Sequence, residues 1–249
     1  MSHGNLRCVV RTEVGSRGGV NEDSAHAGSH AFAVADGMGG HPHGEVASGV
    51  AVAVLAELDG QPPGVNPRVL LSQAVAEIGR QLTALAAVDP ELTGTGTTFT
   101  ALYWDGTGFT GAHVGDSRGY LLRSGQLRQL TRDHTFVASL VSDGRITVGQ
   151  AAEHPRRSML LRAIQAGATP EPDLFDCPAK PGDRFLLCSD GLTGHVPLDA
   201  ITAVLRAQAD PDRAADELIR LALDAGGHDN TTCVLIDVPR TGWFRRRFG

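Results

Sequence analysis

The chain has 249 residues, of which 41% are hydrophobic and 5% aromatic, and its formal net charge is -6. This length and apolar content suffice for a packed core built mainly of Ala, Val and Leu. The acidic balance argues against nucleic acid as the main partner, and no stretch approaches the ~18 apolar residues of a membrane span. We therefore expect a cytoplasmic protein. The formal charge gives no signal for an oligomer, so a monomer is the default expectation.

The cysteines support the expectation of a cytoplasmic protein. They lie far apart in the sequence and form no C-x-x-C pair of the kind that binds zinc or exchanges disulfides. We expect all four to be reduced thiols in the core, where a free cysteine behaves as a small apolar residue: Cys8, Cys177, Cys188 and Cys233.

In chain order, apolar or alternating runs bounded by turn residues predict strands at 6–12, 31–36, 97–104, 108–115, 117–123, 126–130, 183–189 and 231–237. Helical periodicity predicts helices at 44–58, 67–87, 197–208 and 211–225. Pro67 and Pro211 occupy the first helical position of two of them, where proline is favoured. The turns WDGTG and RSGQ are typical of hairpins, so the sheets should be antiparallel. These elements predict an α+β fold in which helix pairs cover sheets.

Four aspartates share one pattern, in which an apolar strand adjoins an Asp flanked by small or polar residues. They occur in FAVADGMGG, AHVGDSRGY, FLLCSDGLTG and GGHDNTTCVLI, as Asp36, Asp116, Asp190 and Asp229. Asp-Gly is also a common turn dipeptide, which is sufficient to explain any one of them and equally explains Asp143. The segment GGVNEDSA adds Glu22 and Asp23.

Taken together, these acids predict a metal site. Several carboxylates at the ends of central strands would repel one another unless cations lay among them. Oxygen ligands favour hard divalent cations, and no His/Cys group has zinc spacing, so Mg²⁺ or Mn²⁺ is preferred. Glycines such as Gly37 and Gly191 are expected to leave space for water and substrate. Two ions about 3.5–4 Å apart can orient an attacking water and stabilise charge on a phosphoryl group.

The motifs NEDSA, AVADGMGGHPHGEVAS, GTTFTAL, AHVGDSRGYLLRSGQLRQLTRDHTFV, LVSDGRIT, HPRRSMLLRAI, PGDRFLLCSDGLTGHV and GGHDNTTCVLI occur in this order over about residues 8–238. Together they resemble the metal-dependent protein phosphatases, the type 2C Ser/Thr phosphatases, in their compact bacterial form. The resemblance implies a four-layer α/β/β/α sandwich, with two antiparallel sheets flanked by helix pairs. It places a single catalytic domain at 1–240 and a short basic tail at 241–249.

The resemblance also implies a reaction. Phosphoserine and phosphothreonine in proteins would be hydrolysed by direct attack of a metal-activated water, in opposition to a bacterial Ser/Thr kinase. The cofactors would be two core Mn²⁺ or Mg²⁺ ions and a weaker third. By this resemblance Asp36 bridges the core ions, the Gly37 carbonyl binds one of them, and Asp190 and Asp229 bind the other.

Further roles follow from the same resemblance. Asp116 with Asp190 would hold the third ion, and Glu22 and Asp23 would act through bound waters. The segment 137–168 resembles the family's flap, beside the active site. Its Arg156 and Arg157 are either phosphosubstrate contacts or solvated side chains.

The chain departs from the family pattern at the arginine that grips the substrate phosphate. Five residues before the Asp of N-E-D stands Gly18, and the nearest arginine is Arg17, one residue earlier. We expect Arg17 to bind substrate and to assist catalysis as a bidentate phosphate donor. His41 is a candidate substrate contact, and His41 or His43 a candidate general acid. The alternatives are a loop histidine pair without a catalytic role and protonation of the leaving group by metal-bound water.

Two other functions remain open at this stage. The same site could hydrolyse small phosphoesters, because sequence does not measure how open the cleft is. A non-catalytic binding module could retain the fold. Loss of a metal-binding Asp would mark such a module, and all of them are present.

Overall fold

The structure, a computed structural model, describes residues 6–16, 18–39, 43–60 and 65–240, and the statements below concern these residues. The predicted substrate-binding residues Arg17 and His41 lie outside them, as does the tail 241–249. The roles assigned to those two residues therefore stay predictions.

The strands form two sheets in which every pair is antiparallel, as the hairpin turns predicted. The five-stranded sheet has the order β1 (Arg7–Glu13), β12 (Thr231–Asp237), β11 (Arg184–Cys188), β7 (Arg118–Arg123) and β8 (Gln126–Gln129). The seven-stranded sheet has the order β10 (Asp173–Pro178), β6 (Gly108–Val114), β5 (Phe99–Trp104), β3 (Ala31–Met38), β4 (Gly96–Thr97) and β9 (Ile164–Gln165), with β2 (Asp23–Ala27) paired to β3.

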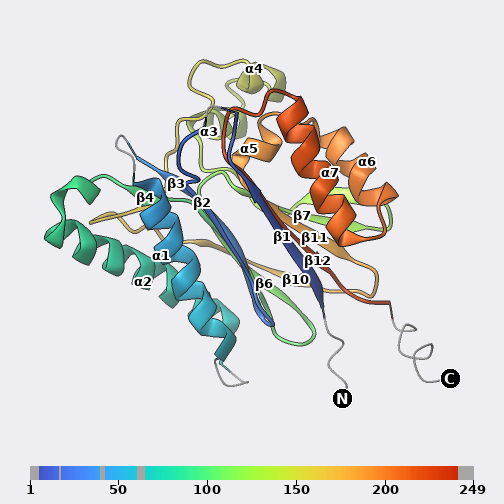
Figure 1. Cartoon of the computed structure of the whole chain (residues 1–249), viewed down its shortest axis with the longest axis horizontal. Coiled ribbons are helices and arrows are strands. Elements are labelled where there is room, and N and C mark those ends of the chain that lie inside the picture. The colour runs from blue at the N-terminus through green and yellow to red at the C-terminus, as the bar shows by residue number, and fades with distance from the viewer. Residues whose placement is uncertain (1–5, 17, 40–42, 61–64, 241–249) are drawn as a thin grey trace.

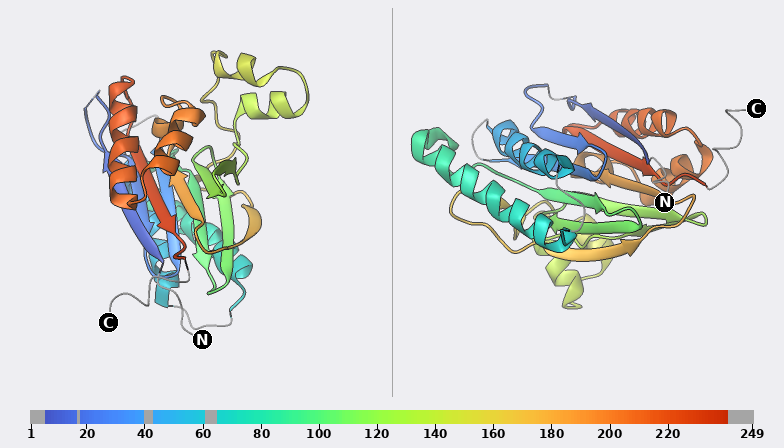
Figure 2. Two further views of the ribbon diagram at one scale, coloured as in Figure 1. Left: turned by 90° about the vertical axis from the view of Figure 1, so that its right-hand side faces the viewer. Right: turned by 90° about the horizontal axis from the view of Figure 1, so that it is seen from below.

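Two pairs of helices cover the outer faces of the sheets (Figure 1 and Figure 2). The helices α1 (Gly44–Ala56) and α2 (Pro67–Val88) pack on the seven-stranded sheet, and α6 (Leu198–Ala207) and α7 (Pro211–Asp224) pack on the five-stranded sheet. The prolines begin α2 and α7 as predicted. The Asn66 and Asp210 side chains cap these helices by accepting from the N–H of Arg68 and Asp212.

A third apolar layer lies between the sheets. Phe32 and Phe109 of one sheet meet Phe185, Leu187 and Val234 of the other, and the Phe109 and Phe185 ring centroids are 4.5 Å apart. Burial of such aromatic side chains holds the two sheets face to face. The predicted four-layer α/β/β/α sandwich is confirmed.

Several short elements escaped sequence prediction. They are β2, β9, β10, α3 (Phe136–Ser142), α4 (Val148–Ala152), α5 (Asp190–Thr193) and the 3₁₀ turns η1 (Glu57–Gly60) and η2 (Pro90–Leu92). Most of them are too short to show a clear period, and the strands β2 (DSAHA) and β10 (DLFDCP) are interrupted by polar residues. The single strand predicted at 97–104 is divided into β4 and β5 at Thr98, whose side chain accepts a hydrogen bond from the Asp36 N–H.

The prediction of four core cysteines holds for three of them. All four are free thiols, and Cys177, Cys188 and Cys233 are buried. Cys8 is exposed and lies on β1, the edge strand of the five-stranded sheet, on the face opposite to that of the buried Val9. None of the helices in the described part of the chain has the length and apolar character needed to span a bilayer.

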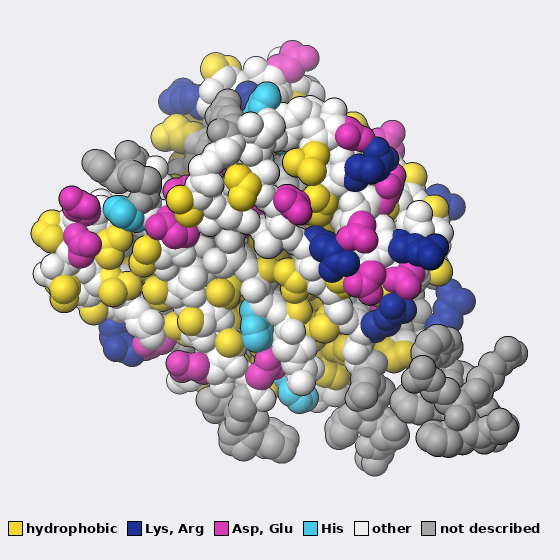
Figure 3. All heavy atoms as spheres, in the orientation of Figure 1, with side chains coloured by type: hydrophobic (Ala, Val, Ile, Leu, Met, Phe, Trp, Pro, Cys, Tyr) yellow, Lys and Arg dark blue, Asp and Glu magenta, His cyan; other side chains and the backbone are white. Residues whose placement is uncertain are grey.

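The outer surface of α7 carries mixed charges, and acidic and basic side chains lie side by side on this face of the molecule (Figure 3). Arg11 of β1 donates from Nε to Asp216 Oδ1 at 2.6 Å and from Nη2 to Asp212 Oδ1 at 3.1 Å. Arg7 pairs with Asp210 at 3.4 Å. These exposed pairs tie the edge strand to the helix, and each contributes little to stability.

Candidate active site

The pairing of β2 with β3 brings two of the predicted acids together. Asp23 lies directly opposite Asp36 in the antiparallel register, so that both side chains stand on one face of the sheet. The prediction that Asp36 ends its strand is wrong, because β3 continues to Met38 and pairs there with β4. The Asp36 N–H donates to the Thr98 hydroxyl and the Asp36 carbonyl accepts from the Thr98 N–H, both at 2.9 Å.

Two further acids come from the connections that follow β6 and β11. Asp116 follows Gly115, whose φ is +111° and whose Cβ, if present, would lie 2.6 Å from the Thr98 Cβ. Only glycine meets both conditions, and the resulting turn directs the chain back beside Asp36. Asp190 is the first residue of α5, directly after β11. Asp116 is buried and Asp190 half-buried.

The last two acids, Glu22 and Asp229, lie next to a hydrogen bond that joins two distant segments of the chain. Asp229 precedes β12 by two residues and is exposed. The adjacent Asn230 side chain accepts from the Glu22 N–H at 2.8 Å, which joins the start of β12 to the segment before β2.

Gly37 lies where two backbone segments pack closely. A Cβ on Gly37 would lie 2.1 Å from the Gly44 carbonyl oxygen, so close packing of backbone requires this glycine. The same holds for Gly191, whose Cβ would lie 2.0 Å from the Asn230 carbonyl oxygen. Backbone packing is thus a reason for both glycines that the sequence analysis did not predict, and the space for water and substrate stays a prediction.

Burial and mutual repulsion control the charge of these acids. Burial, with a further contribution from the carboxylates of Asp190 and Asp229, raises the pKa of Asp23 to about 7. Burial also raises the pKa of Asp116 to about 7, with further contributions from Asp190 and Asp133. The pKa of Asp36 is raised well above its ordinary value by burial and then by the neighbouring carboxylates, chiefly Asp23.

The positive charge that acts on Asp116 comes from a side chain that is already paired. Arg118 donates from Nε to both Asp133 oxygens, at 2.9 and 3.0 Å, and from Nη2 to Asp133 Oδ2 at 2.6 Å. Burial and the Asp229 carboxylate likewise raise the pKa of Asp190. Among the residues that the structure describes, the cluster therefore lacks an internal counter-charge of matching size, a condition that favours a bound cation.

The donors fit a hydrated hard cation. Across the described ranges, no group of three or more His, Cys, Asp or Glu side chains is arranged to hold a metal ion by itself. Mg²⁺ is usually bound by only one or two carboxylates and keeps several waters, so a group of oxygen donors that does not enclose an ion by itself is compatible with it and its chemical relatives. A closed zinc site requires four converging N or S ligands, and the cluster contains only oxygen donors.

Sequence reasoning missed the residues that orient these acids. Ser189, fully buried before Asp190, donates from its hydroxyl to Asp23 Oδ2 at 2.7 Å and accepts from the Thr232 N–H at 3.0 Å. It thereby couples the five-stranded sheet to Asp23 of the other sheet. The signal in the sequence was a serine that directly follows the apolar run FLLC and precedes one of the predicted acids.

A buried histidine pair holds the Asp116 turn. The backbone N–H of His134 donates to the Gly115 carbonyl at 2.8 Å. The ring Nδ1 of His134 accepts from the backbone N–H of Gly115 at 3.1 Å. This leaves Nε2 to donate to Asp173 at 3.1 Å. The His113 ring packs 4.8 Å from that of His134, and burial lowers the pKa of His113 to about 4, so it is neutral at pH 7.

The histidine that the structure describes in the DGMGGHPH motif points toward other acids. Nδ1 of His43 lies 3.8 Å from Glu45 Oε1 and its Nε2 lies 3.9 Å from Glu91 Oε2.

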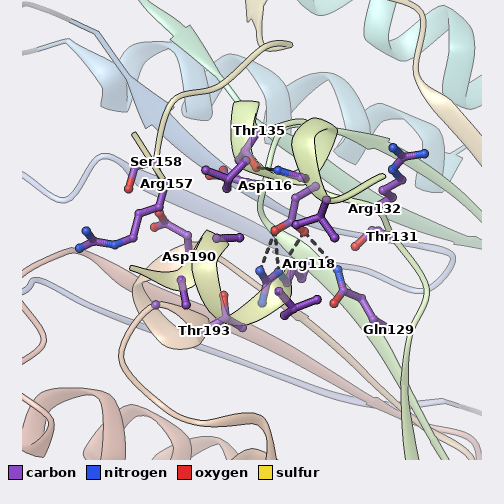
Figure 4. Close-up of a pocket in the computed structure, with 18 of the residues that line it drawn as sticks. Asp116, Arg118, Gln129, Thr131, Arg132, Thr135, Arg157, Ser158, Asp190 and Thr193 are labelled. Atoms are coloured by element: carbon purple, nitrogen blue, oxygen red, sulfur yellow. Dashed lines mark hydrogen bonds and ion pairs between the residues drawn. The ribbon is translucent and has the colours of Figure 1, made fainter. Parts of the chain in front are cut away.

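The two arginines of the flap have different surroundings. The Arg156 guanidinium stacks over the Phe136 ring at 4.3 Å. Arg157 lines a cavity of about 950 Å³ that Asp116 and Asp190 also line (Figure 4).

Comparison with known proteins identifies this arrangement. The family model for protein phosphatase 2C matches residues 13–223. The serine/threonine protein phosphatase PstP of Mycobacterium tuberculosis is 46% identical over 233 residues, which cover 94% of this chain and 45% of that protein. This chain thus spans less than half the length of that relative. The serine/threonine phosphatase stp of Listeria welshimeri is 38% identical over 208 residues, 82% of each chain.

Solved structures give the same result. A crystal structure of the M. tuberculosis phosphatase matches with a TM-score of 0.91 and 44% identity, covering 95% of this chain and all of that one. A structure of the catalytic domain of PstP in complex with two manganese ions matches with a TM-score of 0.88 and 43% identity, covering 94% and 99%. As its motifs predicted, the chain belongs to the protein phosphatase 2C family.

Proposed function

We propose that this chain is a metal-dependent protein serine/threonine phosphatase that hydrolyses phosphoserine and phosphothreonine in proteins. The observation that carries the proposal is the group of buried or half-buried carboxylates gathered from both sheets, which have no matching counter-charge within the described part of the chain. The names of the bacterial relatives and the two manganese ions of the PstP catalytic domain support it.

The cofactors would be Mn²⁺ or Mg²⁺, two core ions and a weaker third. Asp36, the Gly37 carbonyl, Asp190 and Asp229 would hold the core pair, and Asp116 with Asp190 the third. When bound, such ions supply a water nucleophile of lowered pKa and positive charge opposite the phosphoryl oxygens.

The protein's own contribution is to keep these acids in place despite their repulsion. The Thr98 hydroxyl and backbone N–H fix the peptide of Asp36 from both sides. The Ser189 hydroxyl donates to Asp23, which stabilises the charged form of that carboxylate. Asp23 and Glu22 would act through waters, consistent with the hydrogen bonds that already hold their backbone in place.

Other parts of the proposal rest on the family resemblance. Residues 1–240 would form one catalytic domain, and Arg17 and His41 would contact the phosphosubstrate. The partners would be phosphorylated proteins and a Ser/Thr kinase that the enzyme opposes. A monomer in the cytoplasm is expected.

The test is phosphate release from a phosphothreonine peptide by the purified chain with Mn²⁺, with Mg²⁺ and with a chelator. Metal-dependent release that the chelator abolishes is expected, with faster turnover of the peptide than of a small aryl phosphate. Asp36→Asn should lower kcat/KM by at least about a hundredfold, because it removes a charged ligand from the proposed core pair.

Asp143→Asn is the matched control, since Asp143 precedes a glycine as Asp36 does but is exposed at the end of α3. It should retain wild-type activity. Full activity of Asp36→Asn would refute the assignment. Equal or faster turnover of the small aryl phosphate would favour the small-phosphoester hydrolase instead.

A further inference from the structure

The flap lines a cavity that extends from the carboxylate cluster beyond the residues assigned to the metal ions. Its volume of about 950 Å³ lies at the upper end of the range for ligand-binding cavities. Asp116 and Asp190 line it at the side of the carboxylate cluster, and Figure 4 shows both side chains among those that surround the space. The cavity is therefore continuous with the proposed phosphate site.

One part of the wall of this cavity is apolar, where the flap and the start of α6 line it. Val137, Val141 and Val148 come from α3 and α4 of the flap, and Leu198 comes from the start of α6. Val148 is 75% exposed and Leu198 48% exposed. Exposed apolar side chains that line one cavity are typical of a binding surface.

The rim of the cavity is basic. Arg132 and Arg157 both line it and are exposed, at opposite sides of the view in Figure 4, with their guanidinium groups directed outward. An apolar centre with a charged rim is the general anatomy of a protein-binding surface. The positive rim complements a chain that carries phosphate and acidic residues.

We propose that this flap cavity is a specificity subsite for a bulky apolar side chain close in sequence to the phosphorylated residue of a protein substrate. The inference rests on the proposed phosphatase function, because the occupant is the chain whose phosphate lies at the carboxylate cluster. Continuity of the cavity with Asp116 and Asp190 gives that neighbouring residue direct access to the apolar wall. Substrates with an apolar neighbour should therefore be dephosphorylated faster.

The test is a set of phosphothreonine peptides that differ only in the placement of one Leu or one Ser, within about three residues on either side of the phosphothreonine. In wild-type protein with Mn²⁺, Leu should raise kcat/KM about tenfold over Ser at one position or two adjacent ones, as expected for burial of one apolar side chain. At the remaining positions the two peptides should differ by less than about twofold.

The double variant Val148→Asp/Leu198→Asp tests whether the cavity causes this preference. The ratio of kcat/KM for the Leu peptide to the Ser peptide should fall to about one. A peptide with Arg at the selected position should become the better substrate, because its charge complements the new carboxylates. Only direct contact between the cavity and that residue predicts this gain.

Val69→Asp is the matched control. Val69 is 46% exposed in the first turn of α2, outside the cavity, whereas Leu198 and Val148 occupy the first turns of α6 and α4. An acid is compatible with the first turn of a helix, so all three substitutions are comparable in their effect on folding. Val148→Asp alone, at a largely exposed position, gives a second variant if the double variant does not fold.

The outcomes separate this inference from the proposed function. If wild-type protein releases phosphate from every peptide at one rate, or if the Leu preference persists in the folded variants, the subsite is refuted and the phosphatase assignment stands. If wild-type protein releases phosphate from no peptide with either metal, the proposed function fails and the subsite with it. A preference that the variants lose and Val69→Asp retains supports the subsite.

Discussion

The two ends of the β11–β12 pair differ in how their charged side chains are paired. At one end the Arg184 guanidinium, 7% exposed, holds both Asp237 oxygens at 2.6 and 2.7 Å and donates to three carbonyls at the end of α6. At the other end Asp190 and Asp229 face the acids of the second sheet, and burial and repulsion raise the pKa of Asp190. Within the described residues, the charges at the Arg184 end are balanced by a partner of opposite sign, and those at the Asp190 end are not.

The difference separates a structural site from a binding site. A buried ion pair with satisfied hydrogen bonds requires nothing from outside the chain. A group of buried like charges destabilises the fold and persists where a ligand compensates for it. The unbalanced end of these strands is therefore where function is expected.

The largest effect should come from Asp190→Asn at the unbalanced end. We expect kcat/KM for a phosphothreonine peptide to fall at least about a thousandfold, because this residue is assigned to both the core pair and the third ion. The metal-free variant should also melt at a higher temperature than the metal-free wild type, since one of the repelling charges is gone. Loss of activity together with lower thermal stability would contradict this reading of the cluster.

Arg184→Met should have the opposite profile at the balanced end. Removing one partner leaves the Asp237 carboxylate and the α6 carbonyls without their donor, which should lower the free energy of unfolding by about 3 to 5 kcal/mol. Urea unfolding measures this change. The specific activity of the folded variant should remain within about twofold of wild type, and a large loss at a temperature where it is folded would show that the two ends are not independent.

The pH dependence of stability sharpens the comparison further. With the pKa of Asp116 raised to about 7 in the folded state, the folded chain binds more protons than the unfolded chain between about pH 4 and pH 7. The contribution of Asp116 to stability therefore falls as the pH rises through that window. In chelator, Asp116→Asn should match wild type near pH 4 and exceed it near pH 8 by a few kcal/mol.

Comparing the two proteins at each pH cancels the contribution of His113, whose lowered pKa acts in the opposite direction at acid pH. Thermal melts with chelator and then with excess Mn²⁺ measure the effect. If the advantage of the variant is the same at both pH values, Asp116 is not held in a strained charged state.

The smallest effect is expected on the surface of α7. Asp216→Asn removes the partner that Arg11 Nε contacts at 2.6 Å, but Asp216 is largely exposed and Arg11 keeps Asp212 as a partner. The unfolding free energy should change by less than about 1 kcal/mol and the activity should not change. A loss comparable to that of Arg184→Met would mean that the exposed pairs are as important as the buried one.

Local sequence patterns were sufficient to predict the long helices and strands. The helices that begin at Pro67 and Pro211 and the strands around Phe32 and Val234 lie where periodicity and capping residues placed them, because each is long enough to show its period. The short α3 and α4 went unpredicted, and with them the walls of the flap cavity. Elements of five to seven residues are held by their tertiary contacts more than by local preference.

By itself, the sequence was sufficient for the α+β class and for the candidate acids, because apolar strands beside Asp and glycine are recognisable from local patterns. It was sufficient for the family because its motifs resemble those of the type 2C phosphatases. Only the tertiary structure decided which acids lie opposite one another, as in the Asp23–Asp36 pair, and which glycines backbone packing requires. It also decided that Ser189 joins the two sheets through Asp23. The physical reason is that register, burial and the balance of charge depend on residues far apart in the sequence, such as Arg7 and Asp237, which lie opposite each other in the β1–β12 register, and folding alone brings them together.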